Sequence, residues 1–138
     1  MAGSFIDTNI LIYLASGDAR KANAAEEAVY AGGVVSVQVL NEFANVALRK
    51  LGFSWEEIHV FLDSCRAVLD VVPLTGAIHA RGLGLAERYQ LSVYDAMIVA
   101  AALESRCDQL LSEDLQDGMT IEGMAISNPL KDLGGLAG

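Results

Sequence analysis

The chain alternates short apolar runs with longer segments of helical periodicity, and this alternation constrains its fold more than any other feature. The apolar runs do not alternate with polar residues, as strands with one solvated face would. Such runs are typical of a parallel sheet covered by helices on both faces. We therefore expect an α/β protein, specifically a three-layer α/β/α sandwich with a central parallel sheet. The expected strands are residues 4–6, 34–36, 70–73, 109–112 and 120–126.

Helix-capping residues separate these runs. Ser54-Trp55-Glu56-Glu57 has the pattern of a capping box, in which the serine and the second glutamate each bond to the other's backbone. Gly82 and Gly84 are expected to weaken the helix that contains them. The other expected caps are Asp18, Ser36 and Ser92. The expected helices are residues 9–15, 19–31, 37–50, 55–69, 75–89 and 93–106.

Length and composition fit one globular domain. The chain has 138 residues, of which 53% are hydrophobic, and it shows no repeat or linker. We expect a single domain over residues 1–130 and a C-terminal tail over residues 131–138. No apolar stretch reaches the roughly 18 residues that a membrane span needs, and the first strand leaves no room for a signal peptide. Cys65 and Cys107 have no metal-ligand spacing and are expected to be reduced core thiols. These features predict a cytoplasmic protein without a membrane partner.

The formal net charge of −9 argues against nonspecific nucleic-acid binding through a basic surface. It does not exclude a nuclease, because bound cations would offset carboxylates gathered at a metal site.

Four carboxylates lie beside strongly apolar sequence. An ionised carboxylate near a core is costly unless it is paired or binds a metal, and the chain has no comparable set of basic residues to pair with them. Strands of a parallel sheet end at one edge, where ligands bind. Two of the acids follow strands, and the other two lie in the first or second turn of helices expected to start at that edge, which predicts a divalent-cation site. They are Asp7, Glu42, Asp95 and Asp114.

Each acid also has a simpler interpretation. Asp7 could cap a helix, Glu42 could lie on a solvated helix face, and Asp95 could complete a capping box with Ser92. Asp114 and Asp117 lie in an acidic loop, where carboxylates are common. Three polar residues beside the acids could support them, although Asn9 could equally be a helix cap. These residues are Thr8, Asn9 and Ser112.

The motifs of several other chemistries are missing from the sequence. There is no glycine-rich phosphate loop and no recognisable Ser-His-Asp or Cys-His nucleophile motif. Oxygen-only donors suit Mg²⁺ or Mn²⁺. A site of this kind most often acts on phosphate esters.

Four motifs in this order give the chain a resemblance that covers it from the first strand to Asn128. They are Phe5-Ile6-Asp7-Thr8-Asn9-Ile10-Leu11, Asn41-Glu42-Phe43, Leu91-Ser92-Val93-Tyr94-Asp95-Ala96-Met97-Ile98 and Leu110-Leu111-Ser112-Glu113-Asp114-Leu115. Together they resemble the PIN-domain ribonucleases, most closely the VapC-type toxins of toxin–antitoxin pairs.

The resemblance implies a Mg²⁺- or Mn²⁺-dependent endoribonuclease that leaves a 5′-phosphate and a 3′-hydroxyl. It also implies a homodimer and a small antitoxin whose C-terminal segment covers the active site. The family's acidic positions fall on Asp7, Glu42, Asp95 and Asp114, with Asp117 as a candidate fifth, and its polar position after the first acid falls on Asn9.

We expect Asp7, Asp95 and Asp114 to hold one or two metal ions. Glu42 is expected either to bind metal or to orient and deprotonate the attacking water. The alternatives are a DNA-directed nuclease, a non-catalytic PIN binding module and a phosphoacceptor signalling domain. The last typically needs a lysine late in the chain, and here no lysine occurs between Lys50 and Lys131.

Overall fold

The computed structural model describes residues 3–131, which form one sheet flanked by helices. The strands are β1 (Ser4–Ile6), β2 (Val34–Ser36), β3 (Asp70–Val72), β4 (Gln109–Leu111), β5 (Thr120–Ile121) and β6 (Met124–Ser127). The helices are α1 (Thr8–Leu14), α2 (Ala19–Tyr30), α3 (Val37–Arg49), α4 (Trp55–Val68), α5 (Gly76–Tyr89) and α6 (Val93–Glu104).

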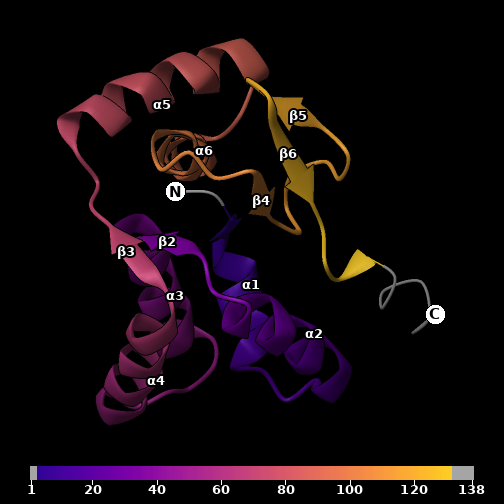
Figure 1. Cartoon of the computed structure of the whole chain (residues 1–138). Coiled ribbons are helices and arrows are strands. Elements are labelled where there is room, and N and C mark those ends of the chain that lie inside the picture. Colours follow the sequence, from indigo (N-terminus) through magenta and orange to yellow (C-terminus); the bar gives the residue numbers. More distant parts are fainter. Residues whose placement is uncertain (1–2, 132–138) are drawn as a thin grey trace.

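The sheet has the order β3-β2-β1-β4-β6-β5 and lies between two helical layers (Figure 1). Helices α5 and α6 lie on one side of it, and α1 to α4 lie on the other. All neighbouring strands are parallel except β5 and β6. The predicted α/β/α sandwich is thus confirmed, with one antiparallel strand at its edge.

The prediction of one strand over residues 120–126 is wrong, because the segment folds into the β5–β6 hairpin. The turn residues Glu122 and Gly123 have φ values of 49° and 87°. Tight hairpin turns require positive φ at these central positions. Glu-Gly is a weaker turn signal than Asn-Gly or Asp-Gly, and the apolar residues around it read as one continuous strand.

The four predicted N-caps are confirmed, although α1 begins at Thr8, one residue before the predicted start, and α5 at Gly76, one residue after it. Ser54 and Glu57 form both bonds of the capping box. Asp18, Ser36 and Ser92 each accept a backbone N–H at the start of their helices. The helices end within two residues of the predicted positions, where fraying makes boundaries uncertain from sequence.

Gly82 does not interrupt α5 but permits its close approach to α6. A Cβ atom at this position would lie 2.9 Å from the Sδ and Cε atoms of Met97 and 3.3 Å from the carbonyl oxygen of Ala96. A Cβ atom on Gly84, by contrast, would meet nothing within 4 Å. The two glycines therefore differ in role, although both are poor helix formers.

The core collects buried apolar side chains from the helices on both sides of the sheet and from strands β1, β2, β4, β5 and β6. Helix α6 is apolar on nearly every side and is buried from Ala96 to Ala102, as expected for a helix enclosed by other elements. On the other side of the sheet, the Phe43 ring of α3 stacks on Phe61 of α4 at a centroid distance of 4.4 Å. This packing makes a rigid base for the residues at the carboxyl ends of the strands.

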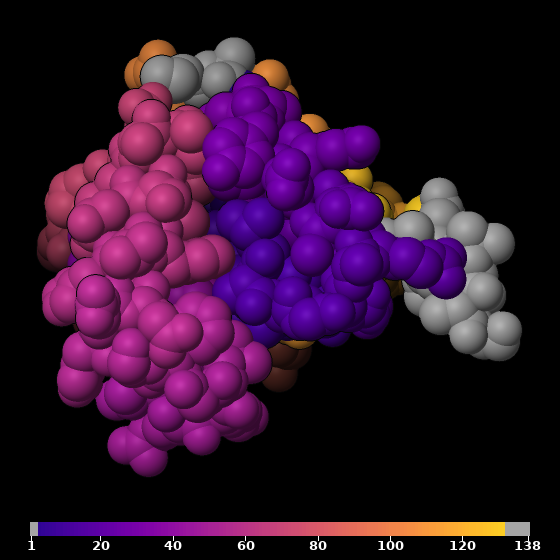
Figure 2. All heavy atoms as spheres, turned by 90° about the horizontal axis from the view of Figure 1, so that it is seen from below, coloured from indigo at the N-terminus to yellow at the C-terminus, as the bar shows by residue number. Residues whose placement is uncertain are grey.

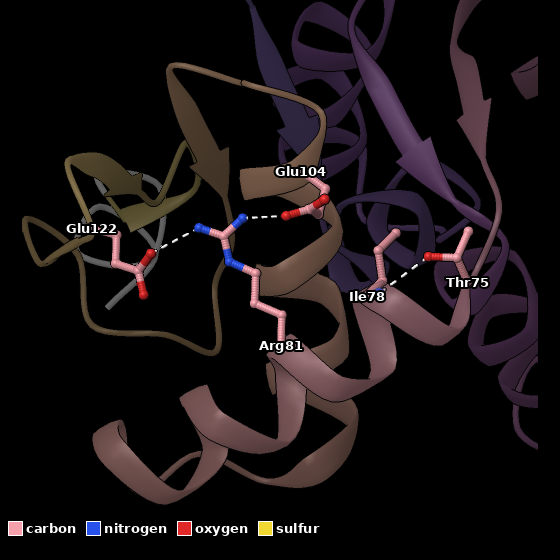
Figure 3. Close-up of polar contacts among 5 residues, drawn as sticks. All are labelled: Thr75, Ile78, Arg81, Glu104 and Glu122. Carbon is pink, nitrogen blue, oxygen red and sulfur yellow. Dashed lines mark hydrogen bonds and ion pairs between the residues drawn. The ribbon is translucent and has the colours of Figure 1, made fainter.

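Arg81 of α5 connects three elements at the opposite end of the sheet from these carboxyl ends (Figure 3). Its guanidinium forms ion pairs with Glu104 at the end of α6 and with Glu122 in the hairpin turn, the latter at 2.8 Å. The same helix begins where the Thr75 hydroxyl accepts the Ile78 N–H at 3.1 Å. Arg81 thus fixes the hairpin against the α5–α6 pair.

Figure 2 shows the N-terminal helices beside the segment around α4 on one face of the molecule. A cleft of about 190 Å³ lies between α2 and α4, with Tyr30 and Phe61 among its lining residues. Within residues 3–131, no helix is long and apolar enough to cross a membrane. Residues 132–138 of the predicted C-terminal tail lie outside the described part of the chain.

Candidate functional site

The site is built where β1 and β4 end side by side. These strands are parallel neighbours, with Ile6 opposite Leu111. The next residue of each strand therefore reaches the same edge of the sheet, and there the Ser112 hydroxyl donates a hydrogen bond to Asp7 Oδ2 at 2.6 Å. Ser112 thus contacts one of the acids, as a supporting residue would, although the two positions are 105 residues apart in the sequence.

Asp7 is an almost completely buried carboxylate. Its exposed fraction is 2%, and its Oδ1 accepts the Thr8 N–H at 2.6 Å, so it also caps α1. Burial is the main reason that the pKa of this carboxyl rises from 3.8 to about 6. The hydrogen bonds from Ser112 and Thr8 oppose the rise, while the charges of Asp114 and Asp95 add to it. The capping and site interpretations of Asp7 are thus compatible.

Glu42 is half-buried on α3 and held at both oxygens. The Thr8 hydroxyl donates to Oε1 at 2.8 Å, and the Gln38 amide donates to Oε2 at 2.7 Å. Thr8 therefore connects two of the acids, since its N–H bonds to Asp7. The Gln38 contact was not predicted, although its spacing of four residues from Glu42 places both on one helix face.

Asp95 is half-buried in the first turn of α6, where its N–H donates to the Ser92 hydroxyl at 3.1 Å. Burial raises the pKa of Asp95 above its ordinary value, the Ser92 hydroxyl lowers it, and the charges of Asp114 and Glu42 raise it further. Asp7 is thus affected by the charges of Asp114 and Asp95, and Asp95 by those of Asp114 and Glu42, so each of the four predicted acids lies near at least one other.

Asp114 is exposed and accepts a hydrogen bond from Asn9 Nδ2 at 2.6 Å. The sequence left open whether Asn9 supports an acid or caps the helix; it contacts Asp114, and the N-cap of α1 is Asp7. The adjacent Glu113 accepts a hydrogen bond from the Tyr13 hydroxyl at 3.1 Å, and Lys21 donates to that hydroxyl at 3.3 Å. These contacts connect the 112–117 loop to α1 and were not predicted, because nothing local in the sequence pairs segments so far apart.

Asp117 lies at the end of the same loop but bonds to other groups. Its Oδ1 accepts the Asn128 N–H and its Oδ2 accepts the Lys131 ammonium, both at 2.8 Å. These contacts lower the pKa of Asp117, with the Lys131 bond as the largest cause. It is also not among the charges that perturb Asp7 or Asp95. The contacts that the structure shows for Asp117 thus tie it to the chain after β6.

The four acids have no cationic partner in the described part of the chain. The ion pairs of residues 3–131 all involve other carboxylates. Within the same residues, no three His, Cys, Asp or Glu side chains are placed to hold a metal ion together. Magnesium is usually bound through only one or two carboxylates, with water and substrate phosphates completing its shell. The oxygen-only donors and the electrostatic cost of the buried Asp7 charge fit such an ion.

The protein is therefore an α/β/α sandwich in which carboxylates without a cationic partner among residues 3–131 lie at the carboxyl edge of the sheet. The chain belongs to the PIN domain family, whose profile matches residues 4–116. No curated protein matches the sequence significantly.

Solved structures with similar folds include several toxin proteins. A toxin–antitoxin complex from Klebsiella pneumoniae is 24% identical, with a TM-score of 0.72 over 92% of this chain and 98% of that one. VapC20 of Mycobacterium tuberculosis, a toxin that cleaves the sarcin–ricin loop, is 20% identical, with a TM-score of 0.66 over 81% and 92%. VapBC2 from Rickettsia felis, bound to a promoter DNA fragment, is 18% identical, with a TM-score of 0.65 over 93% and 98%. At these identities the likeness establishes the fold.

Proposed function

We propose that the protein is a Mg²⁺- or Mn²⁺-dependent endoribonuclease, the toxin of a type II toxin–antitoxin pair. The observation that carries this proposal is the convergence of Asp7, Glu42, Asp95 and Asp114, without a cationic partner among residues 3–131, at one edge of a PIN-domain sheet. The cleavage of RNA by the structurally similar VapC20 supports RNA as the substrate.

The acids divide the work according to their surroundings. Asp7, Asp95 and Asp114 would hold the ion directly or through water, and a bound ion would supply polarisation of the phosphoryl oxygen. Glu42 would orient and deprotonate the attacking water. Its two hydrogen bonds, from Thr8 and Gln38, would hold the carboxylate in one orientation for this task. We leave Asp117 out of the proposed metal site because its contacts lie elsewhere.

The proposed partners are RNA, a small antitoxin and a second copy of the chain, and the proposed location is the cytoplasm. Structural neighbours that are toxin–antitoxin complexes support the antitoxin. Co-purification with the product of an adjacent small gene, followed by mass measurement of the complex, would test both protein partners.

The test of the activity is cleavage of a panel of structured RNAs, including tRNAs, with Mg²⁺, Mn²⁺ or EDTA. Wild type is compared with Asp7→Asn and Asp95→Asn, and all proteins are checked for folding by circular dichroism. Asp70→Asn is the matched control, because Asp70 is an exposed acid at the start of β3, away from the carboxyl edge.

We expect metal-dependent cleavage that is lost in both site variants and retained in the control. Full activity of folded Asp7→Asn would overturn the assignment of the acids. Cleavage of single-stranded DNA alone would indicate a DNA-directed nuclease, and a stable aspartyl-phosphate after incubation with a phosphodonor would indicate a phosphoacceptor domain. Absence of any cleavage would favour the binding-module alternative.

A further inference from the structure

A groove of about 570 Å³ opens directly beside the acids. It is lined by Gln38, Asn41, Glu42, Asn45 and Tyr94. Its volume lies within the range of about 300–1,000 Å³ that is usual for small-molecule sites. Glu42 forms part of the wall, and Tyr94 immediately precedes Asp95, so the groove is continuous with the proposed catalytic site.

We propose that this groove binds an unpaired RNA base next to the scissile phosphate, with Tyr94 as the stacking platform. This inference rests on the proposed ribonuclease function and specifies the kind of substrate that the site takes. RNA-binding proteins commonly recognise unpaired bases by stacking them on aromatic rings and bonding to their edges.

Tyr94 has the exposure that a stacking residue needs. It lies in the first turn of α6 and is 67% exposed, the largest exposed fraction among the large hydrophobic side chains of residues 3–131. A purely apolar ring is more stable when buried, but the tyrosine hydroxyl can form hydrogen bonds with water. The ring can therefore stay exposed in the free protein and offer a face to a base.

The opposite wall offers hydrogen bonds of both kinds. Gln38, Asn41 and Asn45 lie three and four residues apart on α3, so they share a helix face. Gln38 donates to Glu42 and so keeps its carbonyl oxygen available, whereas Asn45 accepts from Arg49 at 2.9 Å and keeps its amide hydrogens. Asn41 is exposed and makes no side-chain hydrogen bond within residues 3–131. Donors and acceptors together match the edge of a nucleobase.

Charge favours a base over the phosphate backbone as the occupant. The lining contains one carboxylate and no basic residue, in a chain whose net charge is −9. A phosphate would be repelled here, but a neutral base would not. Arg49 lies one helical turn beyond Asn45 on the same face and is held there by it. A single strand could therefore place its base in the groove and a neighbouring phosphate near Arg49.

The experiment measures binding of short fluorescent single-stranded RNAs by anisotropy in the presence of Mg²⁺. Every protein carries Asp7→Asn to prevent cleavage, and wild-type cleavage is assayed separately. Tyr94→Ala removes the ring, Tyr94→Phe keeps it, and Asn41→Ala removes an edge contact. Tyr30→Ala is the matched control, because Tyr30 is 59% exposed on α2 and lines a different cleft.

Tyr94→Ala is expected to raise Kd by about 5- to 150-fold, the range that corresponds to loss of one base–aromatic stack. Tyr94→Phe and Tyr30→Ala should bind like the parent protein. Asn41→Ala should change the ranking among oligonucleotides of different base. In the cleaving protein, Tyr94→Ala should raise KM more than it lowers kcat. RNA duplexes, whose bases are not free to enter the groove, should bind more weakly than single strands.

Unchanged single-strand binding by Tyr94→Ala would overturn the base-binding groove, even if wild type cleaves RNA. If Tyr94→Ala weakened binding of the antitoxin but not of RNA, the base-binding proposal would also be overturned, and the groove would be a protein-binding surface. Weaker RNA binding by Tyr94→Ala in a protein that cleaves nothing would support the groove while refuting the ribonuclease proposal. No RNA binding by any variant would refute both.

Discussion

Removing the charge of Asp7 should stabilise the metal-free fold. The folded state raises the pKa of this carboxyl from 3.8 to about 6, chiefly because the group is buried. A difference of this size corresponds to about 3 kcal/mol, which is a large part of the about 5–15 kcal/mol that stabilises a typical domain. Asp7→Asn keeps an acceptor for the Thr8 N–H and a group that can bond to Ser112, but it carries no charge.

The sign of the pH dependence follows from the direction of the shift. Because the folded pKa lies above the unfolded one, the folded state holds the proton more tightly. The stabilising contribution is complete below a pH of about 4 and is lost as the pH rises through about 6. Wild type in EDTA should therefore lose up to about 3 kcal/mol of unfolding free energy from Asp7 across this interval. Asp7→Asn should lack this component.

Urea denaturation followed by far-ultraviolet circular dichroism measures the effect. In EDTA at a pH of about 7.5, Asp7→Asn should be more stable than wild type by up to about 3 kcal/mol. Added Mg²⁺ should stabilise wild type, because an ion that binds only the folded state shifts the equilibrium toward it, and should affect the variant less. Asp114→Asn is the control, since Asp114 is exposed and its removal should change stability by no more than about 0.5 kcal/mol. A variant at Asp7 that is less stable than wild type at this pH would refute the reasoning.

Three further predictions concern the rest of the fold. Gly84→Ala should raise the unfolding free energy by about 0.5–1 kcal/mol, because its Cβ meets nothing within 4 Å. Gly82→Ala should give no gain, because Met97 would have to move. Equal effects of the two substitutions in urea denaturation would contradict this prediction. Arg81→Gln should lower the unfolding free energy by about 1 kcal/mol, and the loss should shrink in about 1 M NaCl, where screening is strong; a salt-independent loss would point to packing. Burial raises the pKa of the Cys65 thiol to about 11, so alkylation by iodoacetamide should be slow until denaturant unfolds the chain, and rapid labelling of the native protein would contradict its burial.

Local patterns in the sequence were enough to predict most of the architecture. The capping bonds join residues three apart, and the continuous apolar runs of β1, β2 and β4 indicate buried strands, so neither needs a distant contact to be recognised. The candidate acids were identified in the same way, because a carboxylate beside apolar sequence is conspicuous in any fold. The parallel topology then placed them at one edge.

Contacts between distant segments decided what the sequence left open. Asn9 contacts Asp114, Ser112 contacts Asp7, and Asp117 turns toward Lys131, at separations of 105, 105 and 14 residues. The hairpin at residues 120–127 likewise depends on pairing that a weak turn signal did not reveal.

The electrostatics of the site depend on the same distant contacts. The pKa of a carboxyl reflects its distance from water and from other charges, and both are properties of the packed chain. Sequence alone thus identified the candidate acids, while the tertiary structure decided which of them meet. A hydrogen bond or a desolvated charge exists only where packing brings two groups within reach.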